Sequence, residues 1–133
     1  MLTREQNELV TTTGVGTPGG RLLRQYWQPA ALTEELTDAR PLKPVRLLGE
    51  DLLLFRDEAG NYGVTGRQCP HRGADLNFGR LEDGGLRCPF HGWLFDVHGT
   101  CLQQPAEPAG SNFHAKVRLK SYPAREINGV VFT

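Results

Sequence analysis

Short apolar runs separated by turn-forming residues dominate most of the chain. The stretch VRLLGEDLLLFRDEAGNYGVT predicts three strands, with a tight turn at Gly49–Glu50 between the first two. Further along, WLFDVHGTCLQ predicts two short strands on either side of a turn at His98–Gly99. Many short strands joined by turns that contain Gly and Pro are typical of a small antiparallel sandwich or barrel.

The last part of the chain continues this pattern. In KVRLK the apolar residues Val117 and Leu119 alternate with charged ones, which is the period-two signature of a half-buried strand. A turn at Asn128–Gly129 precedes a final strand that stops in mid-pattern at GVVFT, which suggests an abrupt natural end or a truncated fragment. The residues that we expect in the core are Leu52, Leu54, Val64, Val117, Leu119 and Val131.

The first 42 residues have a different character. TREQNELV predicts a short helix, because Thr3 and Gln6 have the spacing of a capping box. The Gly-rich stretch TTTGVGTPGG should interrupt regular structure, and RLLRQYW predicts a short helix or turn with Tyr26 and Trp27 as packing anchors. We therefore divide the chain into a helical and loop segment at 1–42 and a mainly β domain at 43–133.

Length and charge exclude several classes of protein. A chain of 133 residues predicts one domain, and 15 basic against 15 acidic residues argues against nucleic-acid binding through general positive charge. The N-terminus is too polar for a signal peptide, and the longest apolar run, Leu52–Phe55, is too short to span a bilayer. We therefore expect a soluble cytoplasmic protein with no membrane or nucleic-acid partner.

Two mixed Cys/His clips carry the candidate chemistry. Cys69 and His71 form a Cys-x-His clip, and sixteen residues later Cys88 and His91 form a Cys-x-x-His clip. A single zinc ion accepts two Cys and two His, but zinc clips usually pair like residues with wider spacing. If the two Cys bind one iron and the two His bind a second, each clip reaches both metals, and thiolate and imidazole are both iron ligands.

This arrangement resembles the Rieske [2Fe–2S] motif, in which two His replace two Cys on one iron. The flanking sequences CPHRGA and CPFHGW strengthen the resemblance. It implies that Cys69, His71, Cys88 and His91 hold one [2Fe–2S] cluster in a small subdomain at about residues 68–93. The implied fold is a Rieske-type antiparallel β-sandwich, with the cluster at a tip and the His-bound iron nearer to solvent.

Four neighbouring residues are candidates for supporting roles. Gly73 and Gly92 are either ordinary turn residues or positions where a missing Cβ lets backbone N–H groups approach sulfur. Arg72 could pair with an acidic residue or face a partner. Trp93 should shield the cluster from water on one side.

The other His and Cys residues have weaker claims. Cys101 should be a small buried residue on the strand after a turn, because it lies outside both clips. His98 should be exposed in its turn, and His114 should lie at the surface or at a strand edge. We therefore expect no catalytic residue among them.

Beyond the motif, nearly the whole chain resembles the N-terminal part of phthalate 4,5-dioxygenase-type oxygenase components. That resemblance implies one-electron transfer from a flavin or iron–sulfur reductase to a mononuclear non-haem iron, which hydroxylates aromatic rings or removes O-methyl groups. The iron would belong to a catalytic domain of the same or a neighbouring subunit of a trimer. Its two-His, one-carboxylate motif finds no match in residues 1–133, so we expect that domain to be absent and this chain alone to be catalytically incomplete.

Departures from the respiratory branch of Rieske proteins bear on the redox potential. Ala74 and Phe90 occupy the positions of that branch's extra Cys pair, and Trp93 replaces a Ser that donates to sulfur. Fewer donors destabilise the reduced cluster, so we expect a potential near the low end of the Rieske range, about −150 mV. A free-standing Rieske ferredoxin and a structural zinc module remain as alternatives.

Overall fold

The computed structural model describes all residues from 1 to 133. Helices α1 (Arg4–Thr11) and α2 (Pro18–Leu23) open the chain, and 3-10 helices follow at η1 (Thr33–Glu35), η2 (Leu76–Phe78) and η3 (Phe113–Lys116). The strands are β1 (Pro29–Leu32), β2 (Leu42–Leu47), β3 (Glu50–Arg56), β4 (Tyr62–Gly66), β5 (Arg80–Glu82), β6 (Gly85–Arg87), β7 (Leu94–Phe95), β8 (Cys101–Gln103), β9 (Ser121–Tyr122), β10 (Arg125–Ile127) and β11 (Val130–Phe132).

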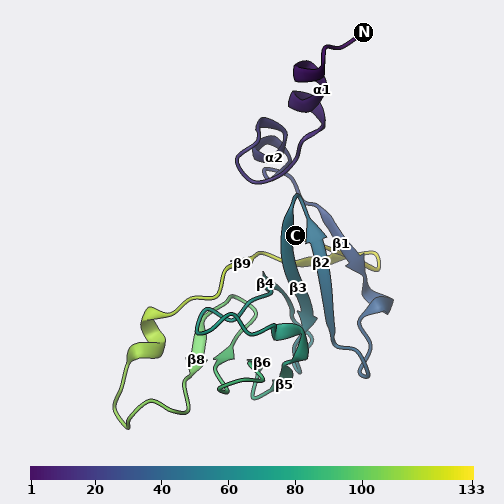
Figure 1. The fold of residues 1–133 in the computed structure, drawn as a ribbon. Helices are drawn as coiled ribbons and strands as arrows, with labels where there is room; N and C mark the ends of the chain where they lie inside the picture. Colours follow the sequence, from purple (N-terminus) through teal and green to yellow (C-terminus); the bar gives the residue numbers. More distant parts are fainter.

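The strands form three antiparallel sheets. Their orders are β1-β11-β10, β2-β3-β4-β9 and β5-β6-β7-β8. In Figure 1 the β5–β8 sheet occupies the end of the molecule opposite to α1. The mainly β, antiparallel fold with a short N-terminal helix is therefore confirmed.

Strand β3 connects two hydrophobic cores. Its residues Leu52 and Leu54 pack with Val64 and Val131 in one core, whereas Leu53 and Phe55 point to the opposite face. Because successive side chains of a strand alternate between faces, four buried residues in a row serve both sides of the sheet. The second core also contains Cys69, Cys88, Trp93 and Cys101, so that the two Cys/His clips rest directly on the central strand.

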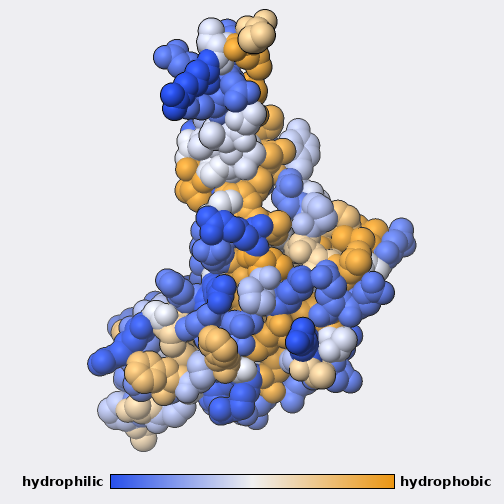
Figure 2. Space-filling view, turned by 45° about the vertical axis from the view of Figure 1, so that its right-hand side comes forward, coloured by the Kyte–Doolittle hydropathy of each residue, from blue (hydrophilic) through white to orange (hydrophobic).

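The N-terminal helices project from this body. Thr3 caps α1 with the reciprocal Thr3–Gln6 capping box that the sequence predicts. Helix α1 has no buried residue, and Figure 2 shows the helical segment as a narrow projection above a wider body whose lower lobe is mostly hydrophilic. No helix of the protein combines the length and the apolar character that crossing a membrane would take.

Three local predictions are wrong, two in the N-terminal segment and one at the first hairpin. Helix α2 begins within the Gly-rich stretch, because the Thr17 side chain accepts from the Gly20 N–H and Pro18 occupies the first turn. Tyr26 and Trp27 are not packing anchors, because 63% and 46% of their surfaces are exposed. The first hairpin turns at residues 48 and 49, both at positive φ, and not at Gly49–Glu50, because Glu50 already pairs in β3.

The KVRLK segment is not a strand. Residues Phe113–Lys116 form a 3-10 helix, and the strand β9 begins only at Ser121. The extended residues between them bond to two different neighbours, since the Leu119 N–H donates to the Gly99 carbonyl and the Lys120 carbonyl accepts from the Gly66 N–H. Val117 is accordingly only half-buried, whereas the other five residues expected in the core are buried.

Backbone pairing joins the two parts into which we divide the sequence. Strand β1, from the first 42 residues, pairs with β11, which lies at the end of the chain. The boundary at residue 42 and the subdomain at 68–93 stay predictions.

Candidate metal centre

Two six-residue loops with the same backbone hydrogen bonds carry the clips. Loop one (residues 69–74) follows β4, and loop two (residues 88–93) joins β6 to β7. In loop one the Gly73 N–H donates to the Cys69 carbonyl and the Cys69 N–H donates to the Ala74 carbonyl, both at 2.8 Å. Loop two repeats this pattern between Cys88 and residues 92 and 93, at 3.1 and 2.8 Å.

Each loop closes through a glycine at the same position. Gly73 and Gly92 have φ values of 70° and 73°, in the left-handed region that other residues avoid. A Cβ on Gly92 would also lie 3.3 Å from Pro105, whereas one on Gly73 would meet no heavy atom within 4 Å. Backbone conformation therefore requires both glycines, and close packing adds a second reason only at Gly92.

The two Cys side chains lie side by side in the core. Cys69 and Cys88 are 2% and 4% exposed, and both are free thiols. Burial raises the pKa of Cys69 to about 11, although the backbone N–H groups of His71 and Arg72 act in the opposite direction. The Cys69 thiol is therefore protonated at neutral pH, and a metal would have to displace that proton.

The two imidazoles form a second pair, closer to solvent. The ring centroids of His71 and His91 are 4.7 Å apart, with 64° between the ring planes. His71 is exposed, and partial burial together with the nearby His91 and Arg72 lowers its pKa. The Nδ1 atom of His91 is buried without any hydrogen-bond partner in the protein. A buried ring nitrogen without a partner is costly, and coordination to a metal ion would satisfy it.

The donors are grouped in pairs. No three His, Cys, Asp or Glu side chains of the chain are close enough together to hold one ion. A single tetrahedral zinc ion needs four donors around one point, whereas a two-iron cluster needs two donors at each end. One pair of thiols and one pair of imidazoles fit the second arrangement.

Aromatic rings pack against both imidazoles. The Trp93 ring of loop two stacks on His71 of loop one, with centroids 4.4 Å apart and 9° between the planes. Phe90 packs on His91 at 4.0 Å, and Phe113 of η3 meets the edge of Trp93 at 6.3 Å. Trp93 is only 8% exposed, so its indole covers one side of the site and fixes the orientation of His71.

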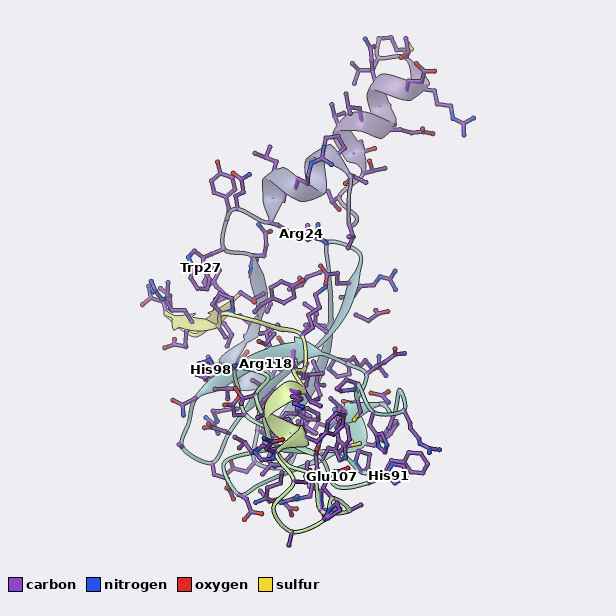
Figure 3. The ribbon with its side chains drawn as sticks, turned by 90° about the vertical axis from the view of Figure 1, so that its left-hand side faces the viewer. Arg24, Trp27, His91, His98, Glu107 and Arg118 are labelled. Atoms are coloured by element: carbon purple, nitrogen blue, oxygen red, sulfur yellow. The ribbon has the colours of Figure 1, made fainter.

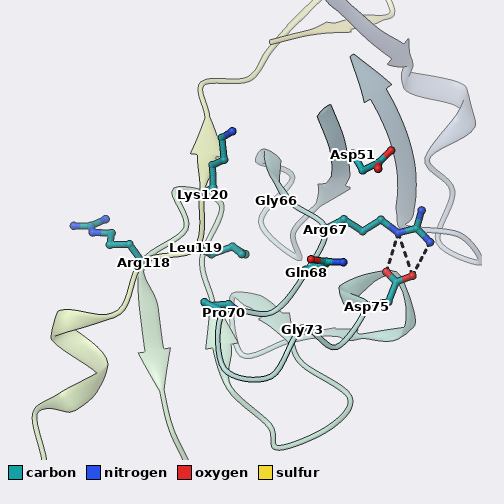
Figure 4. Close-up of a pocket in the computed structure, with 10 residues that line it drawn as sticks. All are labelled: Asp51, Gly66, Arg67, Gln68, Pro70, Gly73, Asp75, Arg118, Leu119 and Lys120. Atoms are coloured by element: carbon teal, nitrogen blue, oxygen red, sulfur yellow. Dashed lines mark hydrogen bonds and ion pairs between the residues drawn. The ribbon is translucent and has the colours of Figure 1, made fainter. Parts of the chain in front are cut away.

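An Arg–Asp pair spans the base of loop one. The Arg67 guanidinium donates to both carboxylate oxygens of Asp75, at 2.6 to 3.1 Å, and thereby joins the residues on either side of the loop. Figure 4 shows this pair on one wall of a polar groove of about 660 Å³, with Arg118 and Lys120 on the other. Neither residue was predicted from the sequence, although their opposite charges lie on either side of the first clip.

The remaining candidates divide as follows. Arg72 is exposed and takes part in none of the ion pairs of the protein. Cys101 is 1% exposed on β8, and burial raises its pKa, as suits a small core residue. His98 is exposed in its turn, as expected, and His114 lies half-buried on η3. Figure 3 shows His91 at the far end of the molecule from α1, well removed from His98.

These loops and sheets define a class of protein, the small β proteins that hold an iron–sulfur cluster between two Cys/His loops. Comparison with known families agrees, because the Rieske [2Fe-2S] domain model matches residues 26–123. The chain belongs to the Rieske [2Fe–2S] family.

Within this family the chain is similar to the oxygenase subunits of known enzymes. The chain is 47% identical over 136 residues to the 5,5'-dehydrodivanillate O-demethylase oxygenase subunit of Sphingobium sp. The aligned residues cover 99% of this chain and 32% of the relative. It is 43% identical over 134 residues to the phthalate 4,5-dioxygenase oxygenase subunit of Pseudomonas putida, covering 99% of the chain and 30% of the relative.

A solved structure shows the same fold. Apo dicamba monooxygenase superposes with a TM-score of 0.73 at 33% identity, covering 83% of this chain and 33% of the other. The chain thus spans about a third of the length of each of these proteins.

Proposed function

We propose that the chain is an electron-transfer module whose Cys69 and Cys88 hold one iron of a [2Fe–2S] cluster and whose His71 and His91 hold the other. The observation that carries this proposal is the pairing of donors across two loops with the same backbone hydrogen bonds, with the His91 Nδ1 left without a protein partner. When bound, such a cluster supplies reversible one-electron transfer at a potential above that of an all-Cys cluster, because neutral imidazoles replace two anionic thiolates.

The residues of the chain prepare the site for that role. Burial keeps water from the thiols, and the N–H groups of His71 and Arg72 face the Cys69 sulfur, where they would stabilise a thiolate. The Trp93–His71 stack holds one imidazole in a fixed orientation at the surface. Rigid ligands limit the rearrangement that accompanies a change of charge at the site.

Electron paramagnetic resonance of the dithionite-reduced protein, with iron and sulfide analysis on the same sample, tests the ligand assignment. A rhombic signal of low average g with two irons and two sulfides per chain would support it. His91→Ala should abolish the signal, whereas the matched control His98→Ala, which changes an exposed turn residue, should leave it intact. One zinc per chain without iron would overturn the proposal.

We further propose that the module serves an oxygenase component. Its relatives are named as oxygenase subunits of an O-demethylase and of a dioxygenase, and the chain matches about a third of each. The partners would then be a flavin or iron–sulfur reductase and a mononuclear iron of the same or a neighbouring subunit, within a trimer. The aromatic substrate would bind outside residues 1–133.

Reduction by a partner tests this wider role. The purified holoprotein should be reduced by NADH only when a flavin and iron–sulfur reductase is present, and the visible spectrum follows this directly. Reduction that no such reductase accelerates would contradict it. The three free thiols and the cluster ligands also favour a reducing compartment, and we propose the cytoplasm.

A further inference from the structure

Arg87 is a nearly buried cation directly before loop two. It is the last residue of β6, and its side chain is only 11% exposed. Its Nη1 donates to the carbonyl of Gly92 at 2.9 Å, and its Nη2 donates to Asp83 at 2.7 Å and to the Gln103 side chain at 3.1 Å. Its Nε forms an ion pair with Glu82.

One guanidinium therefore joins three separate segments. Glu82 and Asp83 belong to the β5–β6 hairpin, at the end of β5 and in the turn that follows it. Gln103 ends β8, and Gly92 lies inside loop two. The planar fork of Arg presents donors in several fixed directions, whereas Lys presents one compact charge on a flexible stem. At Arg87 all three nitrogens of the fork have an acceptor.

The bond to loop two reaches the residue that follows the second His. Gly92 has a positive φ, and its N–H already closes the loop onto the Cys88 carbonyl. Its carbonyl would otherwise have no partner within the loop, and Arg87 fixes the direction in which it points. The same peptide leads into Trp93, whose carbonyl accepts from the Cys88 N–H at 2.8 Å and completes the closure of loop two.

Loop one is built differently at the matching position. The Gly73 carbonyl accepts no hydrogen bond from the protein, and the loop is instead spanned at its base by the Arg67–Asp75 pair. The Arg67 and Asp75 side chains are 36% and 29% exposed, far more than Arg87. Loop two alone depends on a buried side chain that contacts the loop backbone itself.

We propose that Arg87 is a positioning residue, whose guanidinium fork holds loop two in the conformation that presents Cys88 and His91 to the cluster. The role belongs to the fork and not to the positive charge, because four acceptors on three segments share one planar group. The proposal rests on the proposed function, in which those two residues are ligands. It assigns no contact between Arg87 and the cluster.

The test compares Arg87→Lys with wild type and with Arg80→Lys. Arg80 is the cross-strand partner of Arg87 and shares its ion-pair partner Glu82, but its side chain is 64% exposed. Each holoprotein is mixed with an iron chelator, and the loss of visible absorbance is timed while far-UV circular dichroism follows the fold. Electron paramagnetic resonance spectra of the reduced proteins, recorded below power saturation, report the geometry of the site.

Arg87→Lys should lose its cluster about tenfold faster or more, with an altered g-tensor and an unchanged far-UV spectrum, because supporting residues of metal sites have effects of this size. Arg80→Lys should behave as wild type. Equal rates of loss for Arg87→Lys and wild type would overturn the proposal, and so would loss that merely keeps pace with global unfolding.

A second variant keeps the test decisive if Arg87→Lys fails to fold. Gln103→Met removes one acceptor of the guanidinium and leaves Arg87 in place. Faster cluster loss than in wild type would support the proposal, and an equal rate would overturn it. A wild-type protein that never binds a [2Fe–2S] cluster would defeat the proposed function. A wild-type protein that binds one, with variants indistinguishable from it, would defeat only the role of Arg87.

Discussion

Replacing Glu50 by Gln should remove a buried carboxylate that ties the N-terminal segment to the central sheet. Glu50 begins β3, and its side chain is 11% exposed. It accepts hydrogen bonds from Arg24 at 3.0 and 3.3 Å and from the Tyr122 hydroxyl at 2.8 and 2.9 Å. Lys120 completes the network as an ion-pair partner. In Figure 3 Arg24 lies at the junction between the helices and the body.

The magnitude follows from the displaced pKa. Burial acts to raise the pKa of Glu50, but the hydrogen bonds from Lys120, Tyr122 and Arg24 outweigh it and lower the pKa from 4.5 to about 2. Since one pKa unit corresponds to about 1.4 kcal/mol, the ionised network contributes about 3 kcal/mol. Because the folded pKa is the lower one, this contribution is complete above the unfolded pKa and disappears as the pH falls from 4.5 toward 2.

Urea unfolding at a series of pH values measures the effect. Glu50→Gln should lower the free energy of unfolding by about 3 kcal/mol at neutral pH, and the difference from wild type should shrink below about pH 4. Effects of acid on the metal site are common to both proteins and cancel in the difference. Glu34→Gln, at an exposed carboxylate without an ion-pair partner, is the control. A difference between Glu50→Gln and wild type that does not change with pH would refute the reasoning.

Three further predictions are independent of that network. Gln104→Met should raise the unfolding free energy by about 1 kcal/mol in urea titrations, because the buried Gln104 amide makes no hydrogen bond beyond a weak contact with the Cys101 sulfur; a loss of stability would refute this. Gly99→Ala should lower the melting temperature well below that of Gly60→Ala, because both residues have positive φ but only a Cβ at Gly99 would meet a carbonyl oxygen, at 2.1 Å; equal losses would argue against the clash. The midpoint potential should fall as pH rises through the alkaline range, because reduction favours protonated imidazole, and voltammetry with a flat profile would contradict proton coupling.

Local sequence signals predicted those features that depend on neighbours along the chain. The capping box of Thr3 and Gln6, the burial of Leu52 and Leu54 and the two loop glycines each follow from short-range rules. The four candidate ligands were named from the spacing of the two clips and from the family resemblance, and their role as ligands stays a prediction.

Features that depend on residues distant in the sequence could not be predicted from local patterns. The alternation around Val117 is real, yet the segment is no strand because its backbone bonds go to the β7–β8 turn and to β4 in succession. Arg87 gave no signal beyond a charged residue before a Cys, and its four acceptors come from three segments. A period-two pattern reports which face is buried and does not report what pairs with the backbone.

The burial of the four donors has an electrostatic logic. Cys69 and Cys88 lie in the core, where an ionised thiolate without a cation would be costly, whereas His71 stands at the surface, where a change of protonation is inexpensive. Under the proposed ligation the thiolates require a metal to be charged, and the imidazole pair lies closer to the solvent. The exposed Phe90 and Phe113 flank this imidazole edge. An electron carrier needs its redox-active edge accessible and its charged ligands protected, and the proposed ligand set meets both needs.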